Sequence, residues 1–186
     1  QAQVRAAGVA GKGQAVAVDA AVAKLGADVA PGGVNGLAAD VGTAEGCAAL
    51  VAAHPSADIL VINAGIYGSQ DFFEISDAEW TRYFEVNVMS GVRLARAYLP
   101  GMLQRGRGDF VSFASMAGII PMLLTGAYTA TKFAVIAFTE TLYHENLKSG
   151  VRFACVCPPA VATPLLQQGR DTAWPKMLES QGAPIA

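Results

Sequence analysis

Residues 109–115 read DFVSFAS, and residues 127–148 read AYTATKFAVIAFTETLYHENLK. The first run is short and mostly apolar on both faces, which predicts a strand buried inside a parallel sheet. The second run is long enough for a helix, and Gly150 just beyond it is a residue type that commonly ends one. A buried strand followed by a helix is the repeating unit of an α/β protein.

The same alternation extends along most of the chain. Apolar runs predict strands at 36–40, 58–63, 109–115 and 151–157. Thr43 can cap a following helix, and Ser76 with Glu79 forms a capping-box pattern that opens a helix over 76–99. We therefore expect an α/β fold with a Rossmann-type doubly wound parallel sheet, built from right-handed βαβ units.

Composition narrows the class of protein. The chain has 186 residues, 53% of them hydrophobic and only 15% charged, with a net charge of −2. Its length fits a single domain over 1–186, and the low charge suggests either an oligomer or missing polar parts of a larger chain. The net charge gives no reason to expect nucleic acid or an anionic membrane as partner. No apolar run is long enough for a membrane span, and the start lacks a signal peptide's apolar stretch.

The three cysteines, Cys47, Cys155 and Cys157, have no metal-ligand spacing. Cys155 and Cys157 alternate along a predicted strand, so their side chains share one face. We interpret them as small buried hydrophobic residues in a reduced, cytoplasmic protein, and we expect no metal site.

Polar residues or turns follow three of the predicted strands. The strand at 58–63 runs into Asn63-Ala64-Gly65, the next ends at Ser115, and the last runs into 158–163. Ligands and catalytic groups of doubly wound sheets gather at these carboxyl ends. The site is therefore expected there.

Tyr128 and Lys132 lie four residues apart in the helix that follows Ser115, so they share one helical face. A Y-x-x-x-K pair alone is common in helices. Together with Asn-Ala-Gly after a strand, Ser115 thirteen positions before Tyr128, and Asn87 in the intervening helix, it resembles the short-chain dehydrogenase/reductase family. The resemblance covers roughly Leu37 to Pro164.

This resemblance implies an NAD(P)-dependent oxidoreductase that interconverts a secondary alcohol and a ketone. Tyr128 would be the acid/base, and Ser115 would hold the substrate oxygen near it. Lys132 would lower the pKa of the phenol and bind the ribose hydroxyls. Asn87 would anchor a water that links Lys132 to solvent. The cofactor, NAD or NADP, would supply the hydride.

The resemblance also implies a set of cofactor contacts. Asp40 and Val41 would meet the adenine, and Val161 and Thr163 would bind the carboxamide. The adenine ribose side would be lined by Asn63, Ala64 and Gly65. The family usually has Pro-Gly where this chain has Pro158-Pro159, and a proline fixes φ and removes an N–H, so the backbone there is expected to differ.

The glycines Gly8, Gly11 and Gly13 do not fit the phosphate-binding fingerprint, because only one helix separates them from the strand at 36–40. The segment better matches the end of the family's second strand. We therefore expect the sequence to lack the first strand–helix unit and the last strand. Lys12 lies near the position that selects the cofactor in this family, and a basic residue there weakly favours NADP over NAD.

Two other functions are alternatives to this one. A non-catalytic nucleotide-binding or scaffold protein with this fold is favoured by Pro159 and by the missing turn. A serine hydrolase is disfavoured because FASMAG surrounds Ser115 instead of G-x-S-x-G. The apolar segments 116–126 and 164–182 predict a hydrophobic substrate such as a steroid, fatty acyl derivative or aromatic alcohol. The helices starting at Ser76 and near Gly126 predict a homodimer or homotetramer.

Overall fold

The computed structural model of the chain describes residues 4–9 and 34–161. Several sequence-based predictions lie outside these residues: the helix expected after Gly13, the cofactor-selecting position near Lys12, the carboxamide contact Thr163, and the apolar segment 164–182.

Five parallel strands form two sheets in the described part of the chain. The first sheet pairs β1 (Val4–Val9) with β2 (Val34–Ala39). The second has the order β3–β4–β5, with β3 at Ile59–Ile62, β4 at Gly108–Phe113 and β5 at Val151–Val156. The four predicted strands are confirmed, and β1 lies where the end of a further strand was expected.

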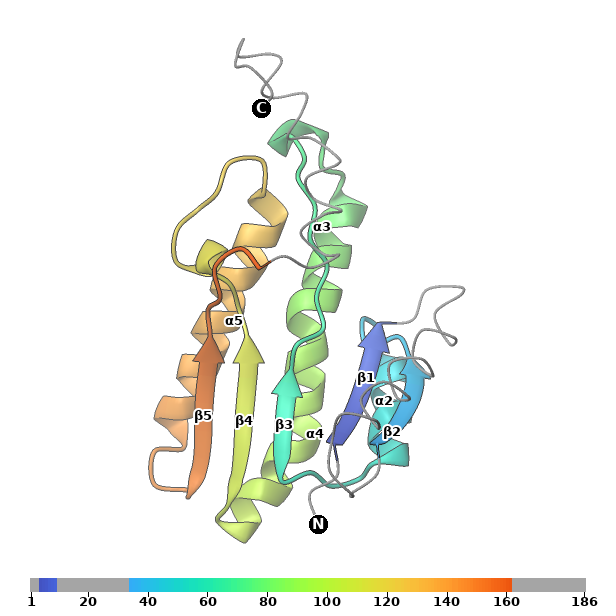
Figure 1. The fold of residues 1–186 in the computed structure, drawn as a ribbon, viewed down its shortest axis with the longest axis vertical. Coiled ribbons are helices and arrows are strands. Elements are labelled where there is room, and N and C mark those ends of the chain that lie inside the picture. The colour runs from blue at the N-terminus through green and yellow to red at the C-terminus, as the bar shows by residue number, and fades with distance from the viewer. Residues whose placement is uncertain (1–3, 10–33, 162–186) are drawn as a thin grey trace.

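Helices α4 (Ser90–Arg105) and α5 (Gly126–Glu145) cover one face of the three-stranded sheet. Helix α2 (Ala44–Ala53) packs against β2 and α4, and α3 (Asp77–Phe84) packs against α5. Figure 1 shows α4 and α5 behind β3–β5, with α3 continuing α4 past the carboxyl ends of the strands. Two short 3₁₀ turns, η1 (Phe72–Glu74) and η3 (Met116–Gly118), lie in the connections at that same end. None of the described helices is both long and apolar enough to cross a bilayer.

Polar caps start the helices where the sequence predicted them. The Thr43 hydroxyl accepts a hydrogen bond from the Gly46 N–H at 3.0 Å, which satisfies one free donor at the start of α2. Ser76 and Glu79 form the reciprocal capping box of α3, with both bonds at 3.3 Å.

Two helix predictions were wrong in detail. The helix expected over 76–99 is divided by a π-helical turn, η2 (Glu85–Met89), and α4 then continues through Pro100 to Arg105. The helix expected to reach residue 148 ends at Glu145, because the Asn146 side chain donates to the Leu142 carbonyl at 2.8 Å.

Gly150 is left-handed, with φ of 78°, but it serves the turn into β5 and not the helix end. A Cβ there would lie 2.1 Å from the Gly106 carbonyl oxygen, so the close approach of these two backbones requires glycine.

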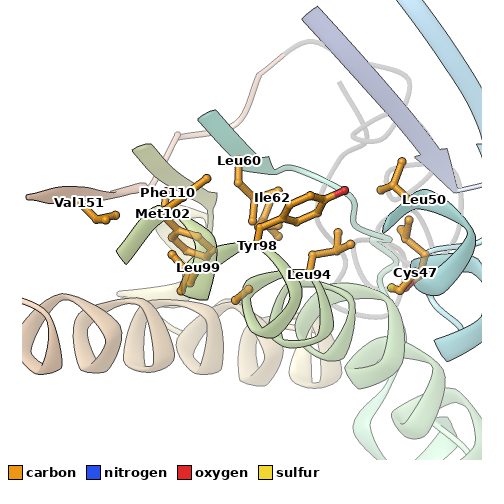
Figure 2. Close-up of a cluster of buried hydrophobic side chains, with 12 residues drawn as sticks. Cys47, Leu50, Leu60, Ile62, Leu94, Tyr98, Leu99, Met102, Phe110 and Val151 are labelled. Carbon is orange, nitrogen blue, oxygen red and sulfur yellow. The ribbon is translucent and has the colours of Figure 1, made fainter. Parts of the chain in front are cut away.

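The main core lies between the sheet and α4. Figure 2 shows Leu60, Ile62 and Phe110 of the strands facing Leu94, Leu99 and Met102 of α4. At its edge the Tyr98 hydroxyl donates to the His54 carbonyl at 2.6 Å, which ties α4 to the end of α2. This apolar layer fixes α4 to the sheet on which the carboxyl ends of the strands are placed.

Candidate active site

Tyr128 and Lys132 occupy the N-terminal half of α5, beside the carboxyl ends of β4 and β5. The helix places the two side chains on one face, and the Lys132 Nζ lies 5.6 Å from the centroid of the Tyr128 ring. The ammonium is therefore above the ring and not at the phenol oxygen.

Ser115 follows β4 and caps the short turn η3. Its hydroxyl accepts from the Ala117 N–H at 3.2 Å and is hydrogen-bonded to the Tyr128 side chain. The turn packs tightly on α5: a Cβ on Gly118 would lie 2.7 Å from the Lys132 carbonyl oxygen. Glycine at 118 thus lets η3 approach α5 closely enough for Ser115 to reach Tyr128.

The pKa of Tyr128 is raised above its ordinary value, chiefly because the side chain is partly buried. The hydrogen bond from Ser115 lowers this pKa, and the nearby Tyr67 raises it. The family resemblance predicts that Lys132 lowers the pKa of Tyr128. That lowering is absent from this arrangement, because the ammonium lies over the ring and binds a backbone carbonyl.

Lys132 is a buried cation, with only 6% of its surface exposed. Its Nζ donates to the Phe113 carbonyl at 2.8 Å, and burial lowers its pKa to about 8, although the adjacent Cys155 and Cys157 act in the opposite direction. Within residues 4–9 and 34–161 no carboxylate forms an ion pair with it. An ammonium has three protons to donate, so Lys132 retains donors for another acceptor.

Asn87 lies in the π-helical turn and is 2% exposed. Its side chain accepts from the Ile66 N–H at 2.7 Å and donates to the Ile66 carbonyl at 3.1 Å. It also donates to the Thr131 hydroxyl at 3.0 Å. Asn87 therefore joins the loop after β3 to α5, next to Lys132.

Gly65 lies between Asn87 and Lys132. A Cβ on this residue would be 3.4 Å from the Asn87 Oδ1 and 3.7 Å from the Lys132 Nζ. The Asn-Ala-Gly segment predicted from the sequence is thus in the same site as the two polar side chains.

Two residues of the site could not be assigned from the sequence. The Tyr67 ring meets the Tyr128 ring edge-on, with centroids 4.8 Å apart and an interplanar angle of 81°. Thr131 binds Asn87 and donates to the Tyr128 carbonyl at 2.7 Å. The sequence signals that could have identified them are their positions: Tyr67 lies two residues after Asn-Ala-Gly, and Thr131 lies one residue before Lys132.

The other predicted cofactor contacts are at the same ends of the strands. The exposed carboxylate of Asp40 accepts from the Gly42 N–H at 3.0 Å, and Asn63 is also exposed. Ala64 is half-buried, and Val161 is 52% exposed. Val41, however, is buried in the main core, so only its backbone remains for a ligand. Exposed polar groups and the spare donors of Lys132 fit a nucleotide with ribose hydroxyls.

The family model described as short chain dehydrogenase matches residues 5–174. The "Uncharacterized oxidoreductase YvaG" of Bacillus subtilis (strain 168) is 38% identical over 136 residues, which are 73% of this chain and 52% of the relative. The chain thus spans about half the length of that curated relative.

Two solved structures share the fold. The L-sorbose reductase of Gluconobacter frateurii, complexed with NADPH and L-sorbose, is 30% identical with a TM-score of 0.77, over 96% of this chain and 70% of that one. A 3-oxoacyl-[acyl-carrier protein] reductase from Brucella melitensis with bound NAD is 28% identical with a TM-score of 0.77, over 87% of this chain and 63% of that one.

Proposed function

The chain belongs to the short-chain dehydrogenase family, and on that premise we propose that it is an NAD(P)-dependent oxidoreductase. It interconverts a secondary alcohol and a ketone. The observation that carries the proposal is the hydrogen bond between Ser115 and Tyr128, from two elements, with the buried Lys132 ammonium beside them. The bound cofactor supplies or accepts the hydride.

In this proposal Tyr128 transfers the proton. Its hydroxyl donates to the carbonyl oxygen of the substrate during reduction and accepts a proton from the alcohol during oxidation. Ser115 holds the same substrate oxygen by a hydrogen bond. A tyrosine is ordinarily protonated at neutral pH, and burial raises the pKa of Tyr128 further, so the resting side chain can donate a proton to a ketone oxygen.

Lys132, Asp40 and Asn63 are proposed to bind the nucleotide. Lys132 donates to ribose hydroxyls with the protons that Phe113 does not accept. Asp40 and Val41 contact the adenine, the latter by its backbone, and Val161 and Thr163 are assigned to the carboxamide. Asn87 is proposed as the anchor of a proton-relay water, held in place by its bonds to Ile66 and Thr131.

An apolar ketone or alcohol is the proposed substrate. Two connections beside the site meet through the Gln70 N–H, which donates to the Leu124 carbonyl at 2.8 Å. They carry large exposed apolar side chains: Phe72, Phe73, Met116, Ile119, Ile120, Met122 and Leu123. Such a patch is typical of a ligand-binding surface. The two solved relatives act, by name, on a sugar and on an oxoacyl carrier, so the choice between polar and apolar substrates rests on this patch.

The test is cofactor binding followed by turnover. Purified protein is titrated with NADH and with NADPH by nicotinamide fluorescence and then assayed on a panel of apolar and polar ketones. Tyr128→Phe should lower kcat by about 10²- to 10⁴-fold, because it removes the acid/base hydroxyl. Tyr143→Phe is the matched control, since Tyr143 is an exposed residue of the same helix and should keep full activity.

The results separate the two functions considered. Cofactor binding without turnover on any ketone, or equal activity of Tyr128→Phe and the wild type, would favour a non-catalytic nucleotide-binding or scaffold protein. Preference for small polar ketones would agree with the proposed oxidoreductase function but would refute the proposal that the substrate is apolar. The homo-oligomeric state and the cytoplasmic location stay predictions, which gel filtration with light scattering and cell fractionation would test.

A further inference from the structure

Cys155 and Cys157 form a pair of free thiols beside the candidate site. They are two positions apart at the end of β5, so both side chains are on the same side of the strand. The two thiols are hydrogen-bonded to each other. Both are partly exposed, and they pack against Val88, Ala114 and Val135.

The pair adjoins two residues of the proposed catalytic set. The Ser115 backbone is hydrogen-bonded to the Cys157 thiol, and the Lys132 ammonium interacts electrostatically with both thiols. The ladder between β4 and β5 continues past the strand ends through Ala114 N–H to Val156 O at 2.9 Å and Met116 N–H to Pro158 O at 3.0 Å. The backbone therefore holds the two thiols in place.

A disulfide between these cysteines is disfavoured by the same backbone. Residues two apart on an extended strand have Cα atoms about 6.6 Å apart, near the upper limit for a disulfide. The ladder bonds on both sides of Cys157 oppose the contraction that a disulfide needs. The pair therefore stays a dithiol that is available to a bridging ligand.

We propose that Cys155 and Cys157 form a two-thiol binding site for monosubstituted trivalent arsenicals. Such an arsenic atom keeps one carbon substituent and needs two sulfur ligands, which is the number present. Zinc needs four ligands, and within the described residues no group of three or more His, Cys, Asp or Glu side chains could hold a metal ion.

The reaction needs no oxidant or reductant. In phenylarsine oxide the arsenic–oxygen bonds are replaced by two arsenic–sulfur bonds. The oxygen leaves as water with the two thiol protons, and arsenic stays trivalent. Burial raises the pKa of Cys157, so the thiol keeps its proton, which the departing water takes up.

Two thiols that are already in contact bind one arsenic atom far more tightly than either alone, because the second bond forms at a high effective concentration. The bound phenyl group would then lie beside Ser115 and Lys132. Binding does not depend on the proposed oxidoreductase activity, whereas a block of turnover by the bound arsenical does.

The experiment is intact mass spectrometry of the purified protein after treatment with one equivalent of phenylarsine oxide. The expected product carries one phenylarsine oxide minus one water, resists excess glutathione and is reversed by 2,3-dimercaptopropanol. Cys155→Ser and Cys157→Ser should each weaken binding about 100-fold or more, because only one thiol remains. Cys47→Ser is the matched control and should bind as the wild type does, since Cys47 is buried and its thiol donates to the Val41 carbonyl.

Circular dichroism melting of each variant shows whether it is folded, and Cys155→Ala and Cys157→Ala replace any serine variant that is not. An adduct that glutathione removes, or that survives in the folded single-cysteine variants, would overturn the proposal. So would loss of the adduct in Cys47→Ser. Turnover is measured on the same samples. If the adduct forms without inhibition, the binding site stands and the expected block of turnover by the arsenical is refuted. If the untreated protein is inactive, only the proposed oxidoreductase function is refuted.

Discussion

Helices α4 and α5 cover the same face of the three-stranded sheet, but they bury opposite kinds of side chain (Figure 1). The buried residues of α4 are mainly apolar and include Leu94, Ala95, Leu99 and Met102. Those of α5 are mainly polar and include Thr129, Thr131, Lys132 and Thr139. The helix that supports the fold and the helix that carries the site are therefore distinct.

The difference between the two helices shows that a helix that carries functional polar groups contributes less to the stability of the folded state than one that buries apolar groups. Burying hydrocarbon stabilises the folded state directly, whereas each buried polar group must first find a partner. In α5 other elements supply some of these partners: Ser112 for Thr139, Phe113 for Lys132, and Asn87 for Thr131. Carbonyls of α5 itself accept the protons of the Thr131 and Thr139 hydroxyls. Substitutions in the two helices should thus affect stability and activity separately.

The largest expected change in stability comes from α4. Leu99→Ala removes a side chain buried in the main core and should lower the free energy of unfolding by about 2 to 5 kcal/mol. Activity per folded molecule should stay unchanged, because the side chain does not reach the site. Urea denaturation gives the first quantity, and turnover normalised to the folded fraction gives the second.

Leu147→Ala is the control for this substitution, because Leu147 is 60% exposed and should change stability by no more than about 0.5 kcal/mol. If the two variants were equally stable, α4 would not be the supporting helix that we describe.

Lys132→Met tests α5 and should act in the opposite direction. The pKa of Lys132 is about 8 in the folded protein against 10.5 for an ordinary lysine, so burying the charged form costs about 3 kcal/mol near pH 7. The methionine variant should be more stable than the wild type there by up to that amount, and it should have lost turnover.

This gain should depend on pH in a defined direction. Between pH 8 and 10.5 the unfolded lysine is protonated and the folded one is not, so the wild type gains stability as pH rises. The difference between the two proteins should shrink over that window. Urea denaturation at several pH values measures it, and a constant difference would show that Lys132 is not a buried cation in solution.

The smallest effect is expected for the hydroxyl pair between β4 and α5. Ser112 and Thr139 are both buried, with their oxygens 2.8 Å apart. Thr139→Val leaves the Ser112 hydroxyl without this partner and should cost about 1 to 3 kcal/mol, whereas Ser112→Ala should cost about 1 kcal/mol, because the Thr139 hydroxyl still donates to the Val135 carbonyl at 2.6 Å. The double variant should cost clearly less than the sum. A double-mutant cycle by thermal unfolding measures the coupling, and strict additivity would contradict it.

Most of the fold could be predicted from the sequence because its signals are local. The apolar runs gave four of the strands, and the Thr43 and Ser76 caps are where expected. What could not be predicted depends on contacts between distant segments. The π-helical turn is not encoded by a glycine or proline within it, and the end of α5 depends on a side-chain bond of Asn146 and not on Gly150.

The sequence predicted which of the candidate residues lie near one another, but it did not predict how their side chains are oriented. Ser115, Tyr128, Lys132 and Asn87 do lie together, as motif spacing indicated. The direction of the Lys132 ammonium, toward Phe113, could not be read from an i,i+4 spacing, because spacing fixes the helical face and not the terminal torsions. The edge-on contact of Tyr67 depends on a loop whose path only the folded chain defines.

The π-helical turn around Asn87 has a consequence for how the chain tolerates change in length. Such a turn holds one residue more than an α-helical turn, so α3 and α4 are out of phase with each other by roughly 100°. Deleting one residue between 85 and 89 would bring them back into phase and turn Asn87 away from Ile66. The segment should therefore not tolerate the deletion of a single residue, whereas a surface loop of similar length would.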